Sequence, residues 1–166
     1  MSFRNAPAHA RAVPYDDDKR RVGILSIRQI SLSDVPRAAA LLAELGYPTS
    51  DAAFAERLAA IANNPDDAVL VAEENGTVVG LVSVHSFEMI HRPGRLGRVT
   101  ALVVAAAARG RGVGAELLGA AEAHLRAKCC VKLEVTSGEQ RSPAHDFYAA
   151  KGYTEERVRF TKSSGI

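Results

Sequence analysis

The residues best suited to bind a ligand lie at positions 109–114, which read Arg-Gly-Arg-Gly-Val-Gly. Alternating glycines let the backbone approach a ligand closely and turn its amides outward. An amphipathic stretch that predicts a helix follows, and the first turn of a helix leaves N–H groups unpaired at the positive end of its dipole. These amides, with two arginines that stay charged at any working pH, predict a site for a phosphate or pyrophosphate.

Two known phosphate-binding motifs differ from this segment. A P-loop needs a lysine and a hydroxyl after its last glycine, and none follows Gly114. The dinucleotide fingerprint is Gly-x-Gly-x-x-Gly after the first strand of a βαβ unit, whereas here Gly-x-Gly-x-Gly follows a predicted antiparallel hairpin. Glu134 falls about 20 residues later, where a ribose-binding acid would stand, so a dinucleotide-binding oxidoreductase stays an alternative.

Apolar periodicity predicts the elements that position this segment. Asn75 and Gly76 form the strongest short-range signal for a hairpin. Ser33 is the expected N-cap of the first helix, which Gly46 ends. The expected strands cover 24–30, 69–71, 78–84, 99–104, 131–135 and a last one at Val158 and Phe160, with a loop over 92–97; the expected helices cover 33–45, 50–62, about 15 residues after Gly114, and 144–150.

The predicted order is β-α-α-β-β-β-α-β-α-β, which indicates an α/β (α+β) fold with a mixed sheet and helices on its faces. Residues 22–166 form a single predicted domain. Residues 1–21 show no apolar periodicity, and we interpret them as a flexible leader.

Composition excludes several classes of protein. The chain has 166 residues, of which 47% are hydrophobic, and a net charge of +2, as in one globular domain without a strong pull towards nucleic acid or anionic membranes. No apolar run approaches the roughly 20 residues that span a membrane. Cys129 and Cys130 are adjacent, which suits neither a disulfide nor spaced metal ligands. We interpret them as core thiols in a reducing cytoplasm, and no metal is expected.

Two motifs together resemble those of the GNAT superfamily of acetyl-CoA-dependent N-acetyltransferases. Arg109-x-x-Gly112-x-Gly114 is similar to the family's Gln/Arg-x-x-Gly-x-Gly/Ala motif and stands between the fourth predicted strand and the third helix. Residues 144–153, Ala-His-Asp-Phe-Tyr-Ala-Ala-Lys-Gly-Tyr, are similar to its Ala-x-x-Phe/Leu-Tyr-x-x-x-Gly-Phe/Tyr segment. The stretch 24–160 follows the family's order of elements.

The resemblance implies a cosubstrate, acetyl-CoA, that lies where the fourth and fifth strands splay apart. It implies that the amides of the glycine-rich turn hold the CoA pyrophosphate, and that the fourth strand pairs with the pantetheine arm. It further implies direct transfer to a primary amine in a ternary complex, without an acyl-enzyme. The cofactor-binding residues implied are Leu102, Val103, Val104, Arg109, Gly110, Arg111, Gly112, Val113, Gly114, Arg141 and Tyr148.

By the same resemblance, Tyr148 is the general acid that protonates the departing thiolate, a task that suits a phenol with a pKa of about 10. The fourth strand carries no carboxylate, so the general base must lie elsewhere. Glu134 is our candidate, with Glu88, His91 and a chain of waters as alternatives. Arg141 stands where relatives often have an asparagine that contacts pantetheine.

The acceptor is expected to meet the first two helices and the loop before the fourth strand, where acids and arginines are mixed. An amine acceptor and acetyl-CoA are the expected partners; a homodimer is left open. A CoA-binding sensor or partner domain without catalysis is the main alternative function. The candidate acceptor residues are Glu44, Tyr47, Asp51, Glu56, Phe87, Glu88, Met89, His91, Arg92, Arg95 and Arg98.

Overall fold

Five strands form one mixed sheet whose spatial order, β1-β2-β3-β4-β5, follows their order in the chain. The computed structural model describes residues 24–138, 140–156, 160–163 and 165. The first three strand pairs are antiparallel and β4–β5 is parallel. The elements are β1 (Leu25–Gln29), α1 (Val35–Leu45), α2 (Asp51–Ala62), β2 (Asp67–Glu74), β3 (Thr77–Glu88), β4 (Arg95–Val104), α3 (Val113–Ala127), β5 (Cys130–Val135) and α4 (Ser142–Ala150).

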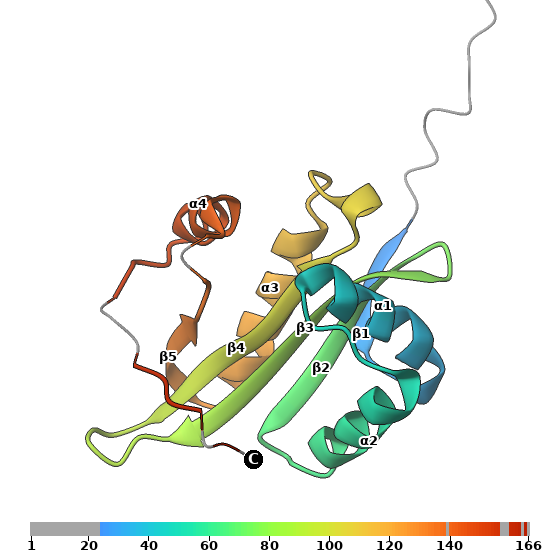
Figure 1. Ribbon diagram of the computed structural model, residues 1–166. Coiled ribbons are helices and arrows are strands. Elements are labelled where there is room, and N and C mark those ends of the chain that lie inside the picture. The colour runs from blue at the N-terminus through green and yellow to red at the C-terminus, as the bar shows by residue number, and fades with distance from the viewer. Residues whose placement is uncertain (1–23, 139, 157–159, 164, 166) are drawn as a thin grey trace, which may run out of the picture.

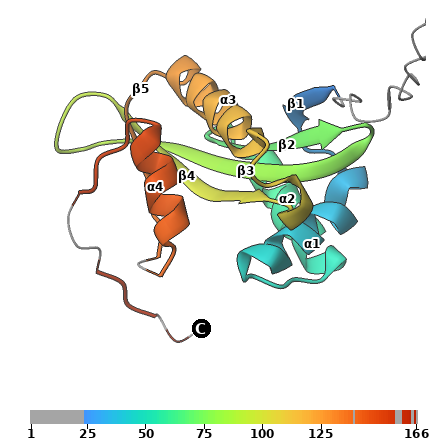
Figure 2. The same cartoon turned by 90° about the horizontal axis from the view of Figure 1, so that it is seen from above.

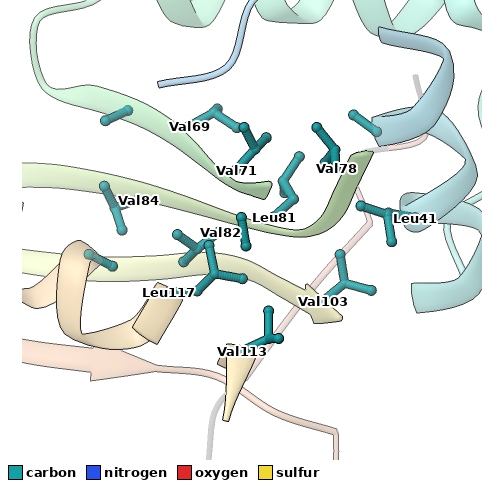
Figure 3. Packing of buried hydrophobic residues seen from close by; sticks show 14 of the residues in the cluster. Leu41, Val69, Val71, Val78, Leu81, Val82, Val84, Val103, Val113 and Leu117 are labelled. Atoms are coloured by element: carbon teal, nitrogen blue, oxygen red, sulfur yellow. The ribbon is translucent and has the colours of Figure 1, made fainter. Parts of the chain in front are cut away.

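Helices cover both faces of the sheet, which confirms the predicted mixed α/β domain. α3 lies on one face, and α1 and α2 lie on the other, while α4 stands across the end of β4 from α1 (Figures 1 and 2). Leu41 of α1 and Leu117 of α3 are fully buried, and valines of β2, β3 and β4 fill the space between the layers (Figure 3). This core fixes the strand ends that carry the site described below.

The loop predicted over 92–97 is wrong at its end, because Arg95 and Gly97 belong to β4. Arg95 already pairs with Glu88 of β3. Gly97 serves packing and not a turn: a Cβ built there would lie 2.8 Å from Cδ1 of Leu125 on α3. A glycine within a strand often marks such a close approach, which composition alone does not distinguish from a loop.

Gly97→Ala is therefore expected to lower the free energy of unfolding by about 1–3 kcal/mol, because Leu125 is buried and cannot move away freely. Chemical denaturation measures this loss. Gly119→Ala is the matched control, since Gly119 lies in α3 with nothing within 4 Å of its Cβ position. The control should be neutral or more stable by up to about 1 kcal/mol. Equal effects in both variants would contradict the packing role of Gly97.

The structure differs from the prediction at the start of the first helix and at the last strand. Ser33 is not the N-cap of α1: a 3-10 turn over Leu32–Asp34 comes first, and Asp34 is the cap residue. Of the last predicted strand, Val158 lies outside the described residues, while Phe160 belongs to no strand and is 91% exposed. The predicted leader, residues 1–21, also lies outside the described residues.

The edge of β4 is open beyond its midpoint. The β4–β5 ladder ends where Val99 pairs with Val135, but β4 continues to Val104. On its other edge, β4 has a bulge: Val99 pairs with Val84 and Ala101 with Ser83, so Thr100 has no partner on β3. Residues 100–104 thus keep one edge without a strand partner in the part of the chain that the structure describes.

Candidate active site

A pocket of about 110 Å³ lies beyond the end of the β4–β5 ladder. The end of α1 and the start of the following loop close one side, and α4 closes the other. Its floor is the free edge of β4. The lining residues are Leu45, Tyr47, Val99, Thr100, Ala101, Leu102, Val135, Thr136, Ser137, Gly138, Arg141, Ala144 and Tyr148.

The glycine-rich turn has the conformation that its sequence predicts. Gly110 and Gly112 have φ angles of +73° and +86°, in the left-handed region that favours glycine. Gly112 is the N-cap of α3, and its carbonyl accepts the N–H groups of Ala115 and Glu116 at 2.9 and 3.1 Å. Among the described residues, the backbone amides of residues 110–114 have no acceptor. They form a row of free donors at the positive end of α3.

The two arginines of the turn contact the protein itself. The Nε of Arg109 donates to the Val104 carbonyl at 3.0 Å, and its Nη2 lies 3.6 Å from Glu44. Arg111 forms an ion pair with Glu74 at the end of β2. Their side chains therefore fix the turn against β2, β4 and α1, and the backbone amides supply its free donors.

Tyr148 lines the pocket from α4. Its ring packs edge-on against Phe147 and Tyr153, with centroids 5.2 and 5.7 Å away. Burial raises the pKa of its phenol, partly offset by the positive charge of Arg141. Its hydroxyl bonds to none of the described residues, so it is available to a ligand. Gly114 brings the turn close to this helix, since a Cβ built at Gly114 would lie 3.7 Å from the Phe147 ring.

Arg141 joins the two helices that flank the pocket. Its carbonyl caps α4 by accepting the N–H groups of Ala144 and His145 at 2.8 and 3.2 Å. Its Nη2 donates to the carbonyl of Leu45 at 2.5 Å. Arg141 lines the pocket, and one edge of its guanidinium ties α4 to the end of α1.

Glu134 lies beside the pocket, and the other two candidate bases do not. Gly97 faces α3, so Arg98, its neighbour on β4, faces the opposite side of the sheet. Glu134 is the cross-strand partner of Arg98 and accepts a hydrogen bond from its Nε, so it shares that face. Glu88 and His91 lie at the far end of β3 and are exposed; Glu88 pairs with Arg95 at 3.5 Å.

One polar pair on this face was not predicted from the sequence. His85 of β3 binds the Oδ1 of Asp67 on β2 through its Nδ1, at 2.7 Å. Polar residues at alternate positions of β3, Ser83 and His85, are the sequence signal that could have indicated a polar face. The pairing with β2 could not be read from that signal, because it depends on register.

The cysteines are only partly as expected. Cys129 is exposed, so its interpretation as a core thiol is wrong; it is the last residue of the turn before β5 and has a φ of +59°. Cys130 is partly buried, and burial raises the pKa of its thiol.

Within the described residues, no three potential metal ligands gather, and no helix is both long and apolar enough to cross a membrane.

Residues 24–153 match the model of the acetyltransferase (GNAT) family. An aminoalkylphosphonate N-acetyltransferase of Salmonella typhimurium is 32% identical over 141 residues, which cover 84% of this chain and 92% of the relative. Glucosamine 6-phosphate N-acetyltransferase 1 of Oryza sativa subsp. japonica is 34% identical over 162 residues, or 93% of each chain.

Solved structures agree on the fold. An aminoglycoside N-acetyltransferase in complex with CoA superposes with a TM-score of 0.77 at 19% identity, over 87% of this chain and 98% of that one. The family match spans both motifs found in the sequence and the whole pocket wall. The chain therefore belongs to the GNAT family and is an acetyl-CoA-dependent N-acetyltransferase that transfers an acetyl group to an amine.

Proposed function

We propose that the transfer occurs directly between acetyl-CoA and a primary amine, both bound at the pocket between β4 and α4. One observation supports this most: the free edge of β4 and Tyr148 line the same pocket. The free amides at the start of α3 lie close to the same helix α4, since a Cβ built at Gly114 would lie 3.7 Å from the Phe147 ring. The free amides, which can bind an anion, the free edge of β4, which can bind an extended chain, and Tyr148, which can donate a proton, are thus neighbours.

In this proposal, the amides of residues 111–114 bind the CoA pyrophosphate as unpaired donors at a helix N-terminus. The free edge at Leu102, Val103 and Val104 pairs with the amide groups of the pantetheine arm, much as an added strand does. An amide of this edge also stabilises the negative charge that develops on the thioester oxygen. Arg109 and Arg141 hold the turn and α4 in place around the cofactor.

The amine nitrogen attacks the thioester carbonyl carbon, the new C–N bond forms, and the C–S bond breaks. Tyr148 gives its proton to the departing thiolate, since burial keeps the phenol protonated. Glu134 accepts the proton that the amine loses, either directly or through water. Arg98 holds this carboxylate on the pocket side of the sheet.

We infer that the acceptor is a small amine that carries a phosphonate or phosphate group. Both curated relatives are named for such amines, an aminoalkylphosphonate and glucosamine 6-phosphate. Their matches cover 84% and 93% of this chain. The free thiols of Cys129 and Cys130 are compatible with a reducing cytoplasm as the compartment.

Calorimetric titration with acetyl-CoA, CoA and NAD, followed by thiol release with 2-aminoethylphosphonate and glucosamine 6-phosphate, tests this function. We expect micromolar binding of acetyl-CoA, no binding of NAD, and CoA release that depends on the amine. Binding without release for any amine would support a CoA-binding domain without catalysis. NAD binding in place of acetyl-CoA would support an oxidoreductase.

Gly112→Ala is expected to weaken acetyl-CoA binding at least about 10-fold, because an L side chain at a left-handed φ costs roughly 1–2 kcal/mol and turns the amides away. Calorimetry on the folded variant measures the change. Gly119→Ala, on the same helix but in open space, should bind like the wild type. Unchanged binding by Gly112→Ala would place the pyrophosphate elsewhere.

A further inference from the structure

A row of polar side chains crosses four strands on the face opposite α3. The register brings Asp67 of β2 opposite His85 of β3, His85 opposite Arg98 of β4, and Arg98 opposite Glu134 of β5. The two outer pairs are bonded, His85 to Asp67 at 2.7 Å and Arg98 to Glu134. Side chains at directly opposed positions share one face of a sheet, so these four form a continuous polar row.

Phe87 lies between the two pairs. Its ring stacks against His85, with centroids 5.7 Å apart, and lies 5.5 Å from the guanidinium carbon of Arg98. The Phe87 ring therefore contacts both the imidazole of His85 and the guanidinium of Arg98. Glu134 holds only the Nε of Arg98, so the guanidinium is oriented on two sides before any ligand arrives.

The outer edge of that guanidinium is free. Among the described residues, nothing accepts a hydrogen bond from the two Nη groups of Arg98, and its side chain is 36% exposed. A fork of two Nη donors matches the oxygens of a phosphate, phosphonate or carboxylate. The Nε2 of His85 also has no partner among those residues, and the side chain is 37% exposed. A protonated His85 thus offers a second donor beside the fork.

The row lies close to the expected reaction centre. Ser83, two residues from His85 on β3, bonds to Thr100, which lines the pocket, at 2.9 Å. Two residues along a strand span about 6–7 Å, which a short linker between an amine and an oxyanion can bridge. An amine placed over Thr100 therefore brings a group at its other end to Arg98 and His85.

We propose that Arg98, with His85 beside it, binds the oxyanion of the acceptor and so selects amines that carry a phosphonate or phosphate group. This inference rests on the proposed function and names the residues that read the acceptor. Glu134 and Phe87 orient the guanidinium, and Asp67 orients the imidazole. The acceptor's amine then points along the face towards Thr100.

Three amines of similar length separate recognition of the oxyanion from recognition of the amine. They are 2-aminoethylphosphonate, β-alanine and propylamine, which end in a phosphonate, a carboxylate and a methyl group. The measured quantity is the kcat/KM of each, by release of CoA thiol. We expect the ratio of aminoethylphosphonate to propylamine to fall about 10- to 100-fold in Arg98→Gln, mainly through KM. Arg98→Lys should recover part of it, and His85→Leu should lose less than Arg98→Gln.

Any effect of the Arg98 substitution on Glu134 changes the kcat/KM of all three acceptors alike, so it cancels in the ratio of aminoethylphosphonate to propylamine. Arg126→Gln is the control for loss of one positive charge: Arg126 lies on α3, is 63% exposed and, among the described residues, pairs with Glu122 alone. Its ratio should not change. A preference for β-alanine over aminoethylphosphonate in the wild type would overturn the phosphonate assignment.

An equal loss for all acceptors in Arg98→Gln, or no preference for the phosphonate in the wild type, would overturn the inference. Acetylation of propylamine in the same assay would still support the proposed direct transfer from acetyl-CoA to an amine. No acetylation of any amine by acetyl-CoA-bound protein would instead remove the proposed function itself. Circular dichroism of each variant confirms that the fold is kept. The two failures are therefore distinguishable.

Discussion

Tyr148→Phe is expected to lower kcat by about 100-fold or more, with little change in acetyl-CoA affinity. The hydroxyl is the only group removed, and it bonds to none of the described residues. The ring contacts with Phe147 and Tyr153 remain. Stability should hence stay within about 0.5 kcal/mol of the wild type. Thiol release gives the turnover, and calorimetry gives the affinity for acetyl-CoA.

The dependence of kcat on pH tests whether Tyr148 acts in its protonated form. Burial raises the pKa of Tyr148 above its ordinary value of about 10, so the phenol keeps its proton through neutral and mildly alkaline pH. The wild type should therefore show no loss of kcat from this group below about pH 10. Loss of the proton at higher pH removes the acid.

Tyr153→Phe is the matched control for Tyr148→Phe. Tyr153 also packs on α4, but its hydroxyl donates to Glu122 of α3 at 3.1 Å, away from the pocket lining. Its loss should cost about 1 kcal/mol of stability and leave kcat near the wild-type value. Near-normal turnover by Tyr148→Phe would rule out this tyrosine as the acid, and equal losses in both variants would indicate a general effect of aromatic packing.

Asp34→Ala is expected to lower the free energy of unfolding by about 2–3 kcal/mol. The Asp34 carboxylate is buried and accepts two bonds from Arg28, at 2.7 and 2.8 Å. It also accepts the N–H and the hydroxyl of Ser31, at 2.7 and 2.8 Å. These bonds tie β1 to the start of α1. The value lies at the lower end for a buried ion pair because Arg28 is partly exposed.

Acid should remove the same stability from the wild type. The Arg28 guanidinium holds the pKa of Asp34 well below its usual range, and the Ser31 bonds add to this. A depressed carboxyl pKa contributes stability above the unfolded-state value of about 3.9, and this stability declines as pH falls below it. Asp34→Ala should lack this component and so lose less stability between pH 5 and 2.

Urea denaturation at several pH values measures both effects. Glu56→Ala is the control, because Glu56 is exposed on α2 and pairs with no described residue. The control should match the wild type within about 0.5 kcal/mol at pH 7. A parallel decline of Asp34→Ala and the wild type in acid would mean that other carboxylates carry the pH dependence.

Local patterns in the sequence predicted the order of the elements and the conformation of the glycine-rich turn. Both are local: helices and strands follow from the period of apolar residues, and Gly110 and Gly112 adopt left-handed angles that other residues resist. The motif around Tyr148 could likewise be found because its residues are close together in the chain. The helix start at Asp34 was misplaced, since its carboxylate reaches back to Ser31 and across to Arg28 on β1.

Contacts between distant strands brought together the polar side chains on the face opposite α3. Asp67, His85, Arg98 and Glu134 are spread over 68 positions of the chain, and strand register alone brings them into one row. A shift of one residue would turn a strand's side chains to the other face. Gly97 shows the same limit, because its purpose is the space taken by Leu125 of α3. Register and packing depend on contacts between distant segments, which no local pattern in the sequence encodes.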